Sequence, residues 1–102
     1  MELGLREYHE REIPFCEKQL VWWTKELETV NKKRLPEARK EDREFVKWAD
    51  ERGYDYGGKY IGEDTEYLLK WRRKCYKWRK YYAEQIEYHK QKLAEYERRA
   101  KR

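Results

Sequence analysis

Two long stretches of the chain carry an apolar residue at every third or fourth position. In the first stretch, steps of three and four alternate through Ile13, Cys16, Leu20, Trp23, Leu27 and Val30. In the second, the same alternation runs from Leu68 to Ala100, with one additional step of four between Tyr82 and Ile86. This spacing gathers the apolar side chains into one seam on one face of a helix. We therefore predict an all-α fold built on two long helical arms.

The helix-breaking residues divide these arms into segments. Pro36 ends or kinks the first helix, and Gly53 is a natural helix C-cap. Residues 53–62 contain four of the five glycines and are predicted to form a loop, after which Asp64 and Thr65 are favourable N-cap residues. The expected helical segments are about 13–34, 37–52 and 64–101, within one domain over residues 1–102.

Two architectures are compatible with these segments. The first is a long antiparallel helical hairpin that is kinked at Pro36. The alternative is a three-helix up-down-up bundle, in which the chain breaks fully at Pro36. Helical pairs of this size bury little apolar surface, so we also expect self-association into a larger helical bundle.

Large aromatic side chains beside the seams identify a candidate interface. Aromatic residues make up 17% of the chain, including five tryptophans. Several of them lie about 100° away from the predicted seams on a helical wheel. An isolated hairpin would leave such rings half exposed, and exposed apolar patches often mark an interface. We therefore predict a homo-oligomer with interface residues Phe15, Trp22, Trp48 and Tyr88.

Basic residues concentrate in the last third of the chain. Residues 70–102 carry 13 Lys or Arg and 4 Asp or Glu, a net charge of +9, whereas residues 1–69 carry 13 and 17, a net charge of −4. In the stretch KWRRKCYKWRKYY (residues 70–82), the helical wheel places most aromatic rings on the seam. Four cations lie on the opposite face and two tyrosines flank them. The candidate ligand-binding residues are Lys70, Arg73, Tyr76, Lys77, Lys80 and Tyr81.

These residues allow more than one interpretation. A row of unpaired cations attracts phosphates, so the leading hypothesis is a non-enzymatic protein that binds nucleic acid or a nucleotide-like ligand. The alternative is a protein-interaction module or inhibitor that docks on an acidic surface of a partner, such as a nucleic-acid enzyme. A third interpretation is purely structural: the row of cations is a solvated helix face, and the basic helix is neutralised by the acidic residues of segment 37–44, namely Glu37, Glu41, Asp42 and Glu44.

The sequence provides little basis for catalysis. Serine is absent, the three threonines lack a nucleophile context, and there is no phosphate-binding glycine motif. Cys16, Cys75, His9 and His89 could in principle bind zinc, but none has a short-range partner at zinc-site spacing. We therefore expect no catalytic residues, no metal ligands and no cofactor.

The first residues, Met-Glu-Leu-Gly, do not resemble a secretory leader, and the longest strictly apolar run is Leu20–Trp23. We expect an intracellular, cytoplasmic protein that does not insert into a membrane. Small, aromatic-rich helical chains of this kind are often binding or inhibitory proteins, including virus-encoded ones. This is a generic likeness, and the sequence carries the signature of no particular family.

Overall fold

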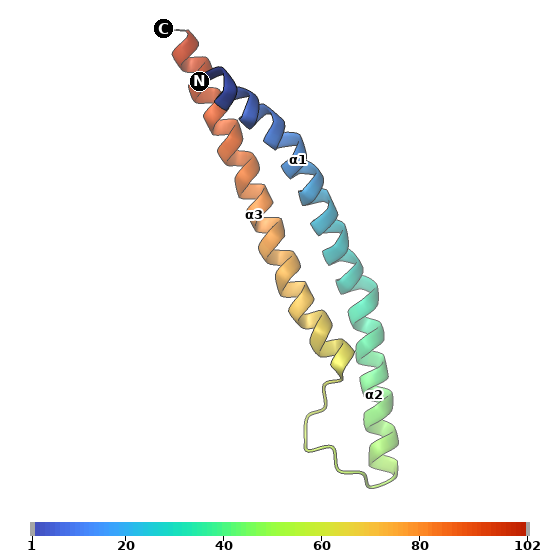
Figure 1. The fold of residues 1–102 in the computed structure, drawn as a ribbon. Coiled ribbons are helices and arrows are strands. Elements are labelled where there is room, and N and C mark those ends of the chain that lie inside the picture. Colours follow the sequence, from blue (N-terminus) through green and yellow to red (C-terminus); the bar gives the residue numbers. More distant parts are fainter. Residues whose placement is uncertain (1, 102) are drawn as a thin grey trace. The chain divides into compact units, whose positions relative to one another are not determined.

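The computed structural model is all-α and describes residues 2–101 (Figure 1). The elements follow one another as α1 (Glu2–Thr29), a π-helical segment η1 (Val30–Arg34), α2 (Leu35–Glu51) and α3 (Glu63–Ala100). No strand occurs within the described residues. The predicted fold class is therefore confirmed, although α1 begins at Glu2 and not near residue 13.

The kink in the first arm lies in η1, directly before Pro36. Proline has no N–H group to donate to a preceding turn, so a regular α-helix would be strained here. Instead, the N–H of Leu35 donates to the carbonyl of Val30, five residues earlier, and the helix continues into α2. Val30 and Leu35 are 0% and 2% exposed, so both ends of the π segment stay in the core. The kinked hairpin is thus the observed architecture, and the alternative with a full break at Pro36 is wrong.

Gly53 ends α2 as the sequence predicts. Its φ of +65° is in the left-handed region, which glycine adopts without a steric penalty. The N–H of Tyr54 donates to the carbonyl of Ala49 at 2.8 Å and closes the last turn. The loop that follows turns back along α2. Its path is shown by the rings of Tyr60 and Phe45, whose centroids lie 4.3 Å apart.

The chain divides into two compact units. Unit 1 consists of residues 1–25 and 76–102, and unit 2 consists of residues 26–75. Each unit pairs a segment of the first arm with a segment of α3. They are described separately below.

In unit 2, a small apolar core is bordered by hydrogen bonds between the two arms. The core consists of Val30, Leu35, Ala38 and Leu68, with Leu69 and Trp71 packed against it. Near the start of α3, Thr65 Oγ1 donates to Asp42 Oδ2 at 2.6 Å. Further along, Trp71 Nε1 donates to Glu26 Oε1 at 3.1 Å. Residues later in α3 therefore meet residues earlier in the first arm, as an antiparallel pair requires.

In unit 1, the seam is largely aromatic. The rings of Trp23 and Trp78 stack at 6.3 Å, and Phe15 approaches Tyr82 edge-on at 6.4 Å. Closer to the chain ends, the imidazoles of His9 and His89 are in contact. Along the whole of α3, which contributes to both units, the predicted seam is confirmed over most of its length: Cys75, Ile86 and His89 are buried, and only the last seam position, Ala100, is exposed.

Candidate functional site

The basic stretch at the start of α3 separates into a core face and an exposed face. Trp71, Cys75, Trp78 and Tyr82 are buried or half-buried. All six candidate ligand-binding residues are exposed. We call Lys70, Arg73, Lys77 and Lys80 the cationic ridge. The division at residue 75 assigns Lys70 and Arg73 to unit 2 and Lys77 and Lys80 to unit 1, so each half is considered within its own unit.

In unit 2, the ridge is only weakly neutralised. Lys70 Nζ lies 3.3 Å from Glu66 Oε1 in an exposed pair one turn apart. Such pairs contribute little, because both side chains stay in water. Arg73 forms no ion pair with the residues that the structure describes. The adjacent Lys74 approaches the Trp71 ring, with its Nζ 5.9 Å from the ring centroid.

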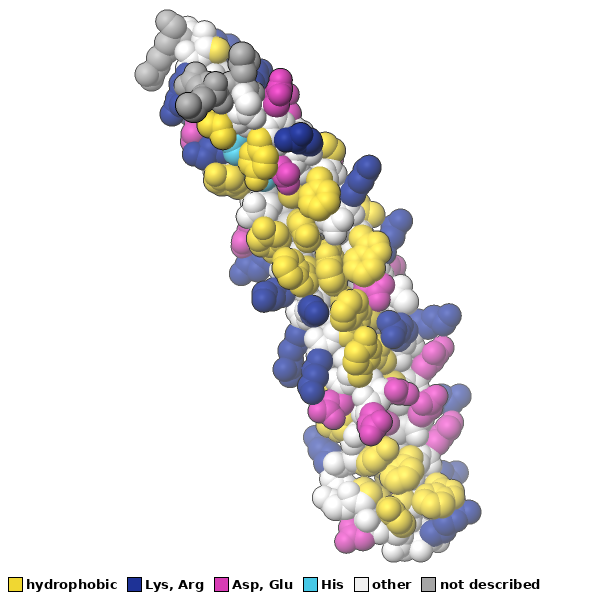
Figure 2. All heavy atoms as spheres, in the orientation of Figure 1, with side chains coloured by type: hydrophobic (Ala, Val, Ile, Leu, Met, Phe, Trp, Pro, Cys, Tyr) yellow, Lys and Arg dark blue, Asp and Glu magenta, His cyan; other side chains and the backbone are white. Residues whose placement is uncertain are grey.

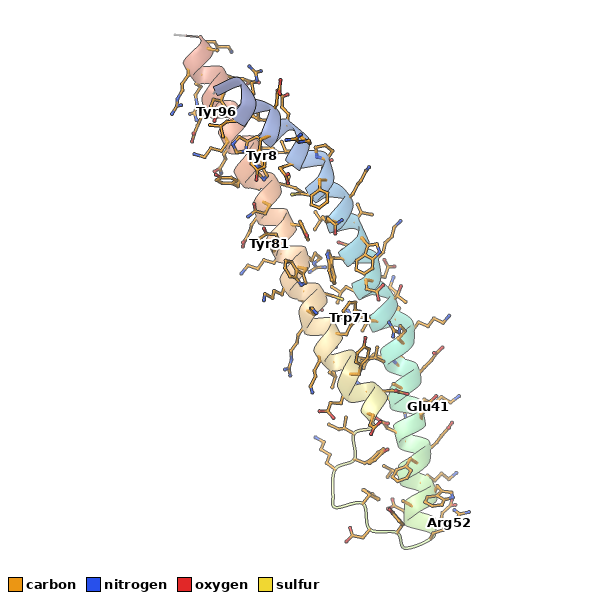
Figure 3. The ribbon with its side chains drawn as sticks, viewed as in Figure 1. Tyr8, Glu41, Arg52, Trp71, Tyr81 and Tyr96 are labelled. Carbon is orange, nitrogen blue, oxygen red and sulfur yellow. The ribbon has the colours of Figure 1, made fainter. Side chains whose placement is uncertain are left out.

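In unit 1, cations and aromatic rings are interleaved. Lys77 and Lys80 have no carboxylate within 4.0 Å among the described residues, and Lys77 Nζ lies 5.8 Å from the Trp78 ring. The guanidinium of Arg79 lies 5.3 Å from the Tyr76 ring, and Tyr81 meets Trp78 edge-on at 5.4 Å. Figure 3 labels Tyr81 on this part of α3, and Figure 2 shows Lys and Arg side chains along the helix. Tyr76 and Tyr81 remain 45% and 44% exposed, so each has ring surface available to a partner.

The expected neutralisation by segment 37–44 is not seen, since no ion pair joins it to residues 70–80 among the described residues; a solvated helix face stays an untested alternative. Asp42 accepts from Thr65, and Glu37 and Glu41 line a shallow hollow together with Asp64 and Tyr67. These acids therefore meet the first turns of α3. The physical reason is the loop, which runs back along α2 and starts α3 opposite the middle of that helix.

The four predicted interface residues are half exposed, as the sequence suggested. Phe15, Trp22, Trp48 and Tyr88 are 50%, 51%, 45% and 47% exposed. Each also contacts another ring, which holds its exposed surface in place; Trp22, for example, lies 4.8 Å from Trp23 between ring centroids. Figure 2 shows hydrophobic side chains gathered on the face in view. Their role in self-association stays a prediction.

Trp48 belongs to a separate aromatic cluster at the end of α2. Its ring stacks on Phe45 at 5.9 Å and lies 6.1 Å from Tyr54. The guanidinium of Arg52, labelled in Figure 3, lies 4.7 Å from the centroid of the Trp48 ring. The loop residue Tyr54 thus lies against part of the Trp48 surface that the sequence assigned to the interface.

Sequence reasoning considered His9, Cys16 and His89 as metal ligands and rejected them, but it did not include Glu12 or expect these side chains to meet in unit 1. Ligand atoms of Glu12, Cys16 and His89 all lie within 4.8 Å of one another. His9 joins the group through its Nδ1, which is 2.7 Å from Nδ1 of His89. His9, Glu12 and Cys16 are spaced three and four residues apart and so share one helix face, which was the available signal. Placing His89 opposite them required the register of the two arms.

Burial shifts the pKa of His9 and of both cysteines. It lowers the pKa of His9, assisted by His89 and Lys92, so the ring is held neutral. Burial also raises the pKa of the Cys16 thiol, with a further contribution from the Glu12 carboxylate. The Cys75 pKa is raised mainly by burial as well. Both cysteines are free thiols, and neither is activated as a nucleophile at neutral pH.

Comparison with known proteins gives no relative: no protein-family model, no curated protein and no solved structure matches the chain. No helix within residues 2–101 has an apolar stretch long enough to cross a bilayer.

Proposed function

We propose that the chain is a non-enzymatic binding protein that engages an anionic partner, nucleic acid or a nucleotide-like ligand, through the cationic ridge. The observation that supports this best is that Arg73, Lys77 and Lys80 are exposed and form no ion pair with described residues. Their charge is therefore available to a partner.

The chemistry of the ridge suits phosphate. Its cations follow one another at steps of three and four along α3. Phosphates that bind there displace condensed counterions, which makes the affinity fall as the salt concentration rises. Tyr76 and Tyr81 add exposed rings on which a base can stack, and stacking of this kind tolerates any base sequence. The ridge is therefore expected to favour single strands without strong sequence preference.

The test is a titration of fluorescently labelled single-stranded and double-stranded oligonucleotides at low and at high salt. The proposal predicts binding at low salt that weakens steeply as salt is added, with single strands preferred. Absence of binding at low salt, or an affinity that does not depend on salt, would overturn it.

A second candidate function is a protein-interaction module or inhibitor that docks on an acidic surface of a partner, such as a nucleic-acid enzyme. It is favoured by the half-exposed rings of Phe15, Trp22 and Tyr88. A shallow groove on α3 places Tyr88 beside Lys80, although Glu84 and Glu87 also line it, so its aromatic surface and not its charge is what favours a protein partner. Pull-down from a nuclease-treated lysate distinguishes this function, because only a protein partner survives the nuclease.

We further propose that the protein self-associates and that it is located in the cytoplasm. The exposed aromatic rings would be covered in a homo-oligomer, which would leave the ridges of both copies facing outward and double the charge offered to a partner. Two free, buried thiols suit the reducing conditions of the cytoplasm.

A further inference from the structure

We infer that Glu12, Cys16 and His89 form a zinc site in unit 1, with His9 as the residue that orients the His89 ring. The three ligand atoms come from both helical segments of the unit and lie within 4.8 Å of one another. The inference does not depend on the proposed binding function, because none of these residues belongs to the cationic ridge.

The spacing of the ligand atoms fits a single ion. Zinc binds thiolate sulfur, imidazole nitrogen and carboxylate oxygen at roughly 2.0–2.3 Å, so its ligand atoms lie roughly 3–4 Å from one another. The ligand atoms now lie within 4.8 Å of one another. Small side-chain rotations that move them by about 1 Å would bring them to such separations. Three protein ligands leave the fourth position of a tetrahedral ion to water.

The donor types select zinc over harder cations. Magnesium and calcium prefer all-oxygen sites, whereas a set of one sulfur, one nitrogen and one oxygen suits zinc. The charges also balance, since the Glu12 carboxylate and a Cys16 thiolate together neutralise a divalent ion. Cys16 would release its thiol proton to solvent on binding.

His9 supplies the second contact that ligating histidines require. A histidine ligand usually donates its other ring N–H to an acceptor, which fixes the tautomer and the orientation of the ring. The Nδ1 atoms of His89 and His9 lie 2.7 Å apart, so His89 can donate to His9 and bind the ion through Nε2. His9 and His89 are only 5% and 2% exposed, which prevents water from replacing this contact freely.

Aromatic rings and one lysine complete the surroundings. Tyr8 packs edge-on against both histidines, with ring centroids 5.2 Å and 5.6 Å away. Tyr88 packs against both as well, at 5.9 Å and 5.2 Å. Lys92 is the nearby cation, and its ammonium is held by Glu95 at 3.5 Å. Figure 2 shows the histidines as a small cyan area between hydrophobic side chains.

Such an ion, with water in its fourth position, would also hold the two segments of unit 1 together. Unit 1 joins its two segments through half-exposed aromatic rings and few buried aliphatic side chains. A zinc ion bound by Glu12 and Cys16 on α1 and by His89 on α3 would fasten them together. Because the unfolded chain lacks the assembled site, binding of the ion would stabilise the folded state.

The test uses Co²⁺ as a spectroscopic substitute for zinc. The full-length chain is stripped with a chelator, kept reduced with a phosphine and titrated with Co²⁺. We expect one ion per chain, visible d–d bands of a four-coordinate ion and a near-ultraviolet sulfur-to-cobalt band that added Zn²⁺ removes. Zn²⁺ should also raise the melting temperature of the apo protein. No sulfur-to-cobalt band at millimolar Co²⁺ overturns the inference.

Matched variants assign the ligands. Cys16→Ser should abolish the sulfur-to-cobalt band and Cys75→Ser should leave it intact. His9→Phe should keep the band but weaken binding about 10–100-fold, as loss of an orienting contact does. A band that survives Cys16→Ser, or that disappears with Cys75→Ser, overturns the assignment.

Circular dichroism checks that each variant is folded. If Cys16→Ser does not fold, Glu12→Gln at a half-buried position replaces it, and an unchanged Co²⁺ affinity in that variant contradicts the site.

Discussion

The indole Nε1 of Trp71 donates a hydrogen bond to Glu26 Oε1 at 3.1 Å. The same carboxylate oxygen lies 3.5 Å from Arg34 Nη1, so one acid connects α3 to the π segment. This contact sets the register of unit 2. It places Trp71 opposite Glu26, while the nearby Arg73 is exposed and forms no ion pair with the described residues.

Removal of this carboxylate should weaken the fold. Glu26→Ala deprives the Trp71 indole and the Arg34 guanidinium of an acceptor, and we expect the free energy of unfolding to fall by about 1–2 kcal/mol. Urea unfolding followed by circular dichroism measures the change. The control is Glu28→Ala, which removes an exposed carboxylate paired with Lys32 one turn away and should leave the urea midpoint unchanged. Equal shifts in the two variants would argue against the role assigned to Glu26.

The π segment should tolerate removal of one residue. A π turn is an α-helix with one residue inserted, so deletion of the exposed Asn31 together with Pro36→Ala should restore a regular helix with both flanking faces in place. Deletion of the exposed Thr24 in regular α1 is the control, because it rotates the preceding residues by about 100° and moves Cys16 off the seam. We expect cooperative thermal unfolding in the first variant and loss of cooperativity in the second. Loss of cooperativity in the Asn31 deletion, with cooperative unfolding of the Thr24 deletion, would show that η1 is required as a π-helix.

The self-association predicted from the half-exposed aromatic rings can be tested by placing a negative charge in the predicted interface. Trp22→Glu should split a homo-oligomer while helicity stays largely intact, because the side chain is half exposed and its loss leaves the seam in place. Tyr67→Glu is the matched control, since Tyr67 is 58% exposed and lies outside the predicted interface. Sedimentation velocity at high micromolar concentration gives the answer. A monomer for the unmutated chain would contradict this prediction.

The Cys75 thiol should be protected in the folded chain. The residue is 0% exposed, and burial raises its pKa, so the reactive thiolate is both scarce and inaccessible at neutral pH. In a Cys16→Ala background, we expect alkylation by iodoacetamide to be at least about ten-fold slower without urea than with it, because labelling requires opening of the structure. Labelling at equal rates in both conditions would place Cys75 outside the core.

The periodic positions predicted the architecture well. The alternating steps from Ile13 to Val30 and from Leu68 to Tyr96 marked the buried faces, and Gly53 marked the end of α2. The helix over the first dozen residues was harder to predict, because its seam residues are polar. His9 is buried there only because His89 lies opposite and supplies a hydrogen-bond partner.

The basic face of α3 was predictable for a local reason. The positions of Arg73 and Lys77 on the exposed side follow from helical geometry alone, whatever the rest of the chain does. The relation of that face to the acidic residues was not predictable, because it depends on how the loop runs. The contact of Tyr60 with Phe45 shifts the register, and the sequence alone does not show which residue of α2 this ring meets. The group around Cys16 and His89 depends on register in the same way.

If the cationic ridge contacts phosphates, its lysines must contribute to the salt dependence of single-strand binding. The affinity for a labelled oligonucleotide is measured over a range of salt concentrations for the unmutated chain, for Lys77→Gln/Lys80→Gln and for the control Lys40→Gln/Lys47→Gln. The control removes the same charge from exposed positions on α2. Each lost phosphate contact lowers the magnitude of the log–log salt slope by roughly 0.7. We predict a slope reduced by about 1.4 for the ridge variant and unchanged for the control. Equal slopes for all three proteins, or no binding by the unmutated chain at low salt, would show that the ridge does not contact phosphates.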